Sequence, residues 1–118
     1  MSVLVIHEKI DNGFDNLVAA LNDKKVDYHF LPLDLFQHYC FNDVNSLKMY
    51  NAFVFAGRIP CDTNGHPYPS DPFVAAYLAG SRVLGNDFKG LLYATSAENV
   101  PLGNISVHTD AKDMAAAI

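Results

Sequence analysis

The sequence predicts one α/β domain over residues 1–118, built as a three-layer sandwich around a mostly parallel sheet of five strands. Two observations lead to this fold class. Apolar runs of strand length alternate with segments of helical spacing, which is the pattern of βαβ units. The length of 118 residues suits one domain, and a hydrophobic fraction of 50% is enough to build a core. The clearest unit runs from Asn51 to Thr95, as apolar run, polar loop, helical segment and second apolar run.

The first part of the chain predicts two strands joined by a helix. Ser2–His7 (SVLVIH) is a continuous β-branched run, typical of a strand that is buried on both faces. A break over residues 11–13 (Asp-Asn-Gly) precedes four apolar residues at helical spacing, which are Phe14, Leu17, Val18 and Leu21. Val26–Leu31 (VDYHFL) then alternates apolar and polar residues as a strand does, and Pro32 ends it.

The next segment predicts little regular structure before the third strand. Between Leu33 and Tyr50 we expect only a turn capped by Asp34 and a short helix over Asn42–Met49. Ala52–Ala56 (AFVFA) is a short apolar run that ends at a glycine, so it predicts the third strand. A long polar loop follows it, and such loops are more often functional than structural in a small α/β domain.

The last part of the chain predicts a long helix, two strands and a terminal helix. Asp71–Leu84 is the long helix, because Asp71 suits an N-cap and Pro72 suits the first helical position. Phe88–Ala94 predicts the fourth strand and Ile105–His108 a short fifth one. A helix is expected from about Asp110 onward.

The predicted sheet is flavodoxin-like in the broad sense, with the strand order 2-1-3-4-5. Ligands of such sheets bind in the crevice outside the carboxyl ends of the strands, at the point where the strand order reverses. In this order the reversal falls between the first and third strands. The residues expected to bound the crevice are His7, Glu8, Gly57, Arg58, Asp71 and Tyr77.

The charge pattern argues against nucleic-acid and membrane partners. The net charge is -5, and the eight Lys and Arg residues are scattered along the chain. A nucleic-acid backbone or an anionic lipid surface needs clustered positive charge. The first residues, MSVLVIHEK, lack the basic region and longer apolar stretch of a signal peptide, and no apolar run approaches the roughly 20 residues of a membrane span. We therefore expect a soluble cytoplasmic protein with a small-molecule ligand.

Common cofactor and metal signatures are absent from the sequence. The segment after the first strand reads HEKIDNG, with no glycine-rich dinucleotide motif and no P-loop. The chain contains no GxSxG nucleophile motif and no HExxH zinc motif. Cys40 and Cys61 form no ligand spacing, so both are expected to be incidental thiols. The sequence predicts no cofactor and no metal site.

The segment DPFVAAYLAGSRVLGND, followed by FKGLLYA, resembles the nucleoside 2-deoxyribosyltransferases. Asp71 matches the family's Asp, Ala75 a small residue and Gly85 the glycine that ends the helix. The element FLPLD, Phe30–Asp34, is similar to the end of the family's second strand. The chain departs from the family where the nucleophilic Glu is replaced by Tyr77.

Two further departures affect the expected substrate contacts. The family's Gly-Thr pair is Phe73-Val74 here, and its Ala-Gly-Pro turn after the first strand is replaced by residues 7–9 (His-Glu-Lys). Phe73 would accordingly contact the substrate or fill its pocket. The other substrate-binding candidates are His7, Gly57 and Arg58, which lie beside it in the predicted crevice.

The resemblance implies an enzyme that cleaves or exchanges the N-glycosidic bond of a nucleoside or nucleotide, in a homo-oligomer. The family's Glu attacks the anomeric carbon, and its Asp orients the reacting groups and handles protons. Asp71 would keep that role, with Tyr77 or Glu8 in place of the missing nucleophile. A tyrosine with a pKa near 10 is neutral at pH 7, so it needs a neighbouring base such as Asp71 or Glu8. The alternatives are a nucleoside-binding protein that has lost the chemistry, and an oligomeric interaction scaffold.

Each candidate also has a structural explanation. Asp71 suits a helix N-cap without any ligand. Tyr77 lies at helical spacing with other apolar residues, which is typical of a core or pocket-wall aromatic. Gly57 ends a strand where the backbone must turn. Glu8 and Arg58 are most simply explained as solvated surface charges. A lone histidine such as His7 is more often structural or merely exposed than catalytic.

Overall fold

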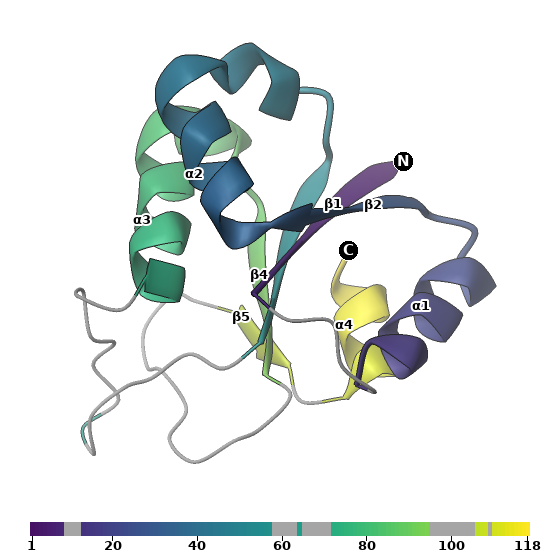
Figure 1. Cartoon of the computed structure of the whole chain (residues 1–118). Coiled ribbons are helices and arrows are strands. Elements are labelled where there is room, and N and C mark those ends of the chain that lie inside the picture. Colours follow the sequence, from purple (N-terminus) through teal and green to yellow (C-terminus); the bar gives the residue numbers. More distant parts are fainter. Residues whose placement is uncertain (9–12, 58–63, 65–71, 95–105, 109) are drawn as a thin grey trace.

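The strands of the computed structural model form one sheet in the order β2-β1-β3-β4-β5, and every neighbouring pair is parallel (Figure 1). The structure describes residues 1–8, 13–57, 64, 72–94, 106–108 and 110–118. The sheet consists of β1 (Ser2–His7), β2 (Asp27–Pro32), β3 (Ala52–Gly57), β4 (Gly90–Ala94) and β5 (Ser106–His108).

The α/β class and the parallel sheet are confirmed, and the predicted extent of the sheet is corrected. Four strands of five or six residues form the sheet proper. The fifth, β5, contributes three residues along the outer edge of β4. The observed strand order is the predicted one.

Helices cover both faces of the sheet (Figure 1). On one face lie α1 (Gly13–Asp23) and α4 (Ala111–Ala117), which pack against each other. On the other face α2 (Leu33–Asn42) packs against α3 (Pro72–Leu84). Two short 3₁₀ turns, Val44–Leu47 and Gly85–Asp87, complete the described elements.

The central strands are apolar at their inner positions because both of their faces are covered. Along β1, Val3 and Val5 pack on the α1/α4 side, whereas Leu4 and Ile6 pack on the α2/α3 side. All four side chains are buried, as expected for the inner strands of a parallel sheet. The edge strand β2 instead alternates exposed and half-buried residues, which explains its alternating sequence.

The expectation for the segment between the second and third strands was wrong. A helix, α2, occupies Leu33–Asn42, where we expected only a turn, and a 3₁₀ turn replaces the expected helix over Asn42–Met49. The apolar face of α2 is narrow, with Leu33, Phe36 and Cys40 buried. Polar and exposed residues surround these three positions, so the helical period is weak in the sequence and packing against α3 stabilises the helix.

The two helices that follow β1 and β3 end in left-handed residues. After α1, Lys25 has a φ of 56°, and its N–H and that of Val26 donate to the Asn22 and Leu21 carbonyls at 3.0 and 3.1 Å. This is the Schellman arrangement, in which the left-handed position normally favours glycine. After α3, Gly85 has a φ of 55°, as its predicted role at the helix end requires.

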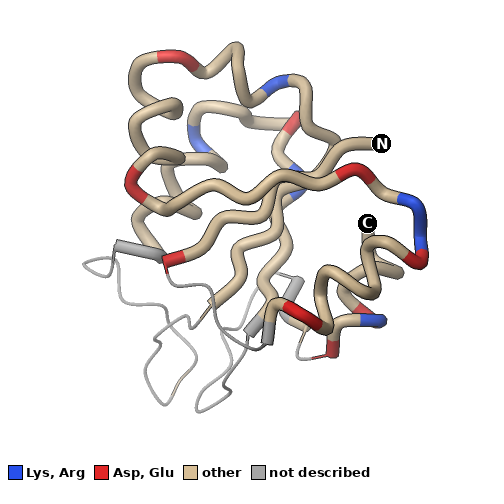
Figure 2. Tube along the Cα trace, turned by 45° about the vertical axis from the view of Figure 1, so that its right-hand side comes forward, with Lys and Arg blue, Asp and Glu red and all other residues tan. Residues whose placement is uncertain are grey.

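The described Lys and Arg residues are distributed over several elements (Figure 2). Asp and Glu residues lie among them along the same trace, so no element carries a run of one sign (Figure 2). Among the described helices, none is long and apolar enough to cross a membrane.

Candidate functional site

The candidate site lies at the carboxyl ends of β1 and β3, where the strand order predicts a ligand crevice. The chain leaves β1 toward α1 on one face of the sheet and leaves β3 toward α3 on the other. The two strands are neighbours, with His7 opposite Ala56 in the register. Helices that depart to opposite faces leave a gap between adjacent strand ends, which is where ligands of open parallel sheets bind.

His7 closes β1 as the one buried polar residue among the described residues, with 7% of its surface exposed. Its ring lies on the α1/α4 side of the sheet, with centroids 6.0 Å from Phe14 and 5.8 Å from Phe30. The buried Nδ1 atom has no hydrogen-bond partner among the described residues. Burial lowers the pKa of His7 from its ordinary value, so the imidazole is neutral near pH 7. A neutral imidazole can accept a proton or a hydrogen bond from a ligand.

Glu8 and Gly57 are the other described candidate residues at the carboxyl ends of β1 and β3. Glu8 follows β1 directly and is exposed, so its carboxylate is available to a ligand or to solvent. Gly57 is half-buried and ends β3, where the missing side chain leaves the backbone accessible. His7, Glu8 and Gly57 therefore lie at one edge of the sheet, as the sequence analysis expected.

Tyr77 occupies a different environment from these three residues. It lies on the α2/α3 side of the sheet, with ring centroids 5.0 Å from Phe55 and 5.3 Å from Phe88. A Cβ atom placed on Gly90 would be 2.9 Å from Tyr77 Cε2. Gly90 opens β4, so the tyrosine ring reaches the amino ends of the strands, away from the crevice.

The surroundings of Tyr77 also disfavour the phenolate that a nucleophile would need. Burial among aromatic rings raises the pKa of Tyr77 above its ordinary value of 10. His7 is on the opposite face of the sheet from Tyr77, and Glu8 follows it at the carboxyl edge. The structure thus does not bring Tyr77 together with the described carboxylate of the predicted site.

The remaining predicted site residues lie outside the described part of the chain. These are Arg58 and Asp71, together with the side chain of Phe73. The α3 helix does begin at Pro72, as the sequence predicted for the residue after Asp71.

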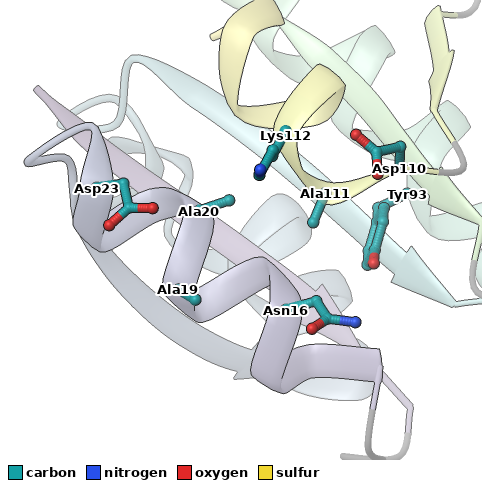
Figure 3. Close-up of a pocket in the computed structure, with 8 residues that line it drawn as sticks. All are labelled: Asn16, Ala19, Ala20, Asp23, Tyr93, Asp110, Ala111 and Lys112. Atoms are coloured by element: carbon teal, nitrogen blue, oxygen red, sulfur yellow. The ribbon is translucent and has the colours of Figure 1, made fainter.

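A cavity of about 360 Å³ lies elsewhere, between α1 and α4 (Figure 3). The described residues that line it are Asn16, Ala19, Ala20, Asp23, Tyr93, Asp110, Ala111 and Lys112. None of them was predicted from the sequence as a site residue. A signal was present, because the four α1 residues follow the spacing i, i+3, i+4 and i+7 that places side chains on one helical face.

The described residues hold no cluster of metal ligands and one buried thiol. No group of three or more His, Cys, Asp or Glu residues among them could hold a metal ion. Cys40 is a free, buried thiol, and burial raises its pKa to about 11. Cys61 lies outside the described residues.

Comparison with known proteins does not extend this description. The chain matches no family model, no curated protein and no solved structure.

Proposed function

We propose that this protein binds a nucleoside or nucleotide in the crevice between the carboxyl ends of β1 and β3. The reversal of strand order between these two strands carries the proposal, because ligands of open parallel sheets bind at such a reversal and His7, Glu8 and Gly57 lie at these strand ends. The resemblance of the α3 segment to the nucleoside 2-deoxyribosyltransferases supplies the ligand class. An exposed carboxylate, a neutral imidazole and an open backbone can hydrogen-bond the hydroxyl and amide groups of such a ligand.

The position of Tyr77 favours binding over covalent catalysis. A deoxyribosyl transfer needs a nucleophile that is charged and points at the anomeric carbon. Tyr77 packs among Phe55 and Phe88, and its raised pKa keeps the phenol protonated. We therefore propose that this tyrosine is a core residue and that the family's chemistry at this position is lost.

Glu8 supports a second candidate function, in which the crevice cleaves or exchanges an N-glycosidic bond. It is an exposed carboxylate at the end of β1, so it can approach a ligand in the crevice. A carboxylate there could act as nucleophile or could stabilise the oxocarbenium-like transition state. Asp71, which is expected to orient the reacting groups and handle protons, would supply the second carboxylate of this reaction.

The experiment compares binding and turnover with the same ligands. The protein is incubated with each 2′-deoxynucleoside and deoxynucleotide, with and without a second free base, and analysed by chromatography. Binding is followed in parallel by amide shifts in nuclear magnetic resonance (NMR) spectra. Binding without base release, with unchanged affinity in Tyr77→Phe, is the expected result.

The variants separate the two candidates. Base release that disappears in Glu8→Gln but persists in Tyr77→Phe and in the control Asp87→Asn would establish the enzyme with Glu8 as its carboxylate. Asp87 is an exposed carboxylate in the turn before β4, remote from the crevice. Shifts that avoid the ends of β1 and β3, or no binding at all, would reject the proposed site.

Homo-oligomerisation remains a prediction of the family resemblance. The exposed large apolar residues Leu35, Phe41 and Leu78 on α2 and α3 are consistent with a protein-facing surface on that side. Light scattering across a concentration series measures the assembly state, and a monomer at all concentrations would remove this part of the proposal.

A further inference from the structure

The cavity between α1 and α4 is a hollow in the helical layer, not part of the crevice at β1 and β3. Tyr93 of β4 forms its floor, and both helices form its walls (Figure 3). His7, Glu8 and Gly57 are not among its lining residues. A ligand here would therefore be independent of the proposed nucleoside site.

The hollow exists because alanines occupy the facing positions of the two helices. Ala20 and Ala111 are both buried beside it, and Ala19 lines the outer wall. A methyl group reaches only a short way from the backbone, so the helices meet without filling the space between them. The resulting volume of about 360 Å³ falls within the range of small-molecule sites, roughly 300–1,000 Å³.

The polar side chains of the described cavity walls do not pair with one another. No ion pair or hydrogen bond joins Asn16, Asp23 or Lys112 to another described residue through its side chain. Asp110 accepts one hydrogen bond at Oδ2, from the Asp113 amide at 3.1 Å. In the view of Figure 3, Lys112 lies between Asp23 on one side and Asp110 on the other.

This arrangement is two carboxylates with one ammonium group. The described lining residues have a net charge of -1, which disfavours nucleotide phosphates and other anions. An uncharged apolar ligand would remove water from Asp23, Asp110 and Lys112 without pairing them. The ligand that best complements these charges carries two positive groups and one negative group, with the negative group beside one of the positive ones.

We propose that this cavity binds a small basic zwitterion, an α-amino acid with a cationic side chain. The ligand's carboxylate pairs with Lys112, and its α-ammonium group pairs with the neighbouring Asp110. The cationic side chain extends along α1 to Asp23, and the Asn16 amide hydrogen-bonds at the opposite end of that helical face. The alanine walls and Tyr93 contact the aliphatic part of the ligand.

NMR titration of the isotope-labelled protein tests this proposal with defined probes. L-arginine and L-lysine should give saturable shifts at the amides of the lining residues, and L-glutamate should not. Agmatine has the guanidinium and ammonium groups of arginine but no carboxylate. Lys112→Gln should therefore lower the affinity for L-arginine about threefold, as expected for the loss of a partly exposed ion pair. The affinity for agmatine should not fall.

A second variant tests the cavity itself. Ala19→Leu places a large side chain on the exposed wall and should weaken L-arginine by about tenfold or more. Lys24→Gln is the matched control for Lys112→Gln, because Lys24 is exposed just after α1 and does not line the cavity. The dispersion of each variant's own spectrum establishes that it is folded.

The inference would be overturned by shifts that stay linear with L-arginine, by equal shifts with L-glutamate, or by unchanged affinity for L-arginine in a folded Ala19→Leu protein. Shifts at the lining residues with a deoxynucleotide alone would also overturn it, and would assign the cavity to the ligand class of the other site.

Discussion

Gly90→Ala is expected to destabilise the protein strongly, because Phe88 is held between two glycines. A Cβ atom on Gly90 would lie 2.5 Å from Phe88 Cε1 and 2.6 Å from Cζ. On the other side of the ring, a Cβ atom on Gly80 would lie 3.0 Å from Cε2. The ring thus packs against the backbone of both β4 and α3.

The magnitude follows from these contacts and from the neighbouring rings. Centroids of Phe53, Phe55 and Tyr77 lie 5.6, 6.0 and 5.3 Å from that of Phe88. Because the added methyl group also meets Tyr77, relief requires both rings to leave this packing. Overpacking of a core costs about 1–3 kcal/mol, and we expect the upper end of that range, about 3 kcal/mol. Total stability is about 5–15 kcal/mol, so the loss is large.

Urea unfolding, monitored by circular dichroism, measures this change in the free energy of unfolding. Gly85→Ala is the control for alanine itself, since no atom lies within 4 Å of a Cβ there and only its φ of 55° opposes the change, at about 1 kcal/mol. Phe88→Leu should cost less in the Gly90→Ala protein than in the wild type, because the smaller side chain relieves the clash. A Gly90→Ala protein within about 0.5 kcal/mol of the wild type would refute the tight packing of Phe88, and with it the core assignment of Tyr77.

Three further outcomes follow from buried groups and backbone strain. Because the pKa of His7 is lowered from 6.5, the unfolded chain binds a proton that the folded chain does not as pH falls below 6.5. Stability should therefore fall with pH in that window, by up to about 1.4 kcal/mol per unit, and His7→Leu but not His38→Gln should remove this slope in urea titrations. Lys25→Gly should raise the free energy of unfolding by up to about 1 kcal/mol, because it removes a side chain from a φ of 56°; a loss of stability would contradict the strain. Cys40, with its pKa near 11, should resist a thiol reagent in the native Cys61→Ser protein and react fully in urea; rapid native labelling would contradict its burial.

Local sequence patterns were sufficient for most of the fold. The β-branched run of β1 predicted a strand buried on both faces, and the alternation over Val26–Leu31 predicted the strand β2. Pro72 and Gly85 marked the ends of α3, because their backbone preferences act within a few residues. The α2 helix was not predicted, because its apolar face is narrow and the helix is stabilised by packing against α3, which lies far away in the chain.

The candidate site was predictable only as a location. Chain order predicted that the ends of β1 and β3 would be neighbours, and the register of His7 with Ala56 agrees. The same order could not predict on which side of the sheet each side chain would lie. Tyr77 was predicted as a site residue from its position in the resembling motif, yet α3 directs its side chain to the aromatic core of the opposite face from His7.

The sequence by itself determined the element types and the alternation that makes parallel pairing natural, because apolar period and turn chemistry are local properties. The tertiary structure alone decided which distant residues meet. It placed the rings of Phe14 and Phe30 around His7, and it formed the cavity where α1 meets α4. Such contacts depend on strand register and on how helices pack across the sheet, and both join segments that are far apart in the sequence.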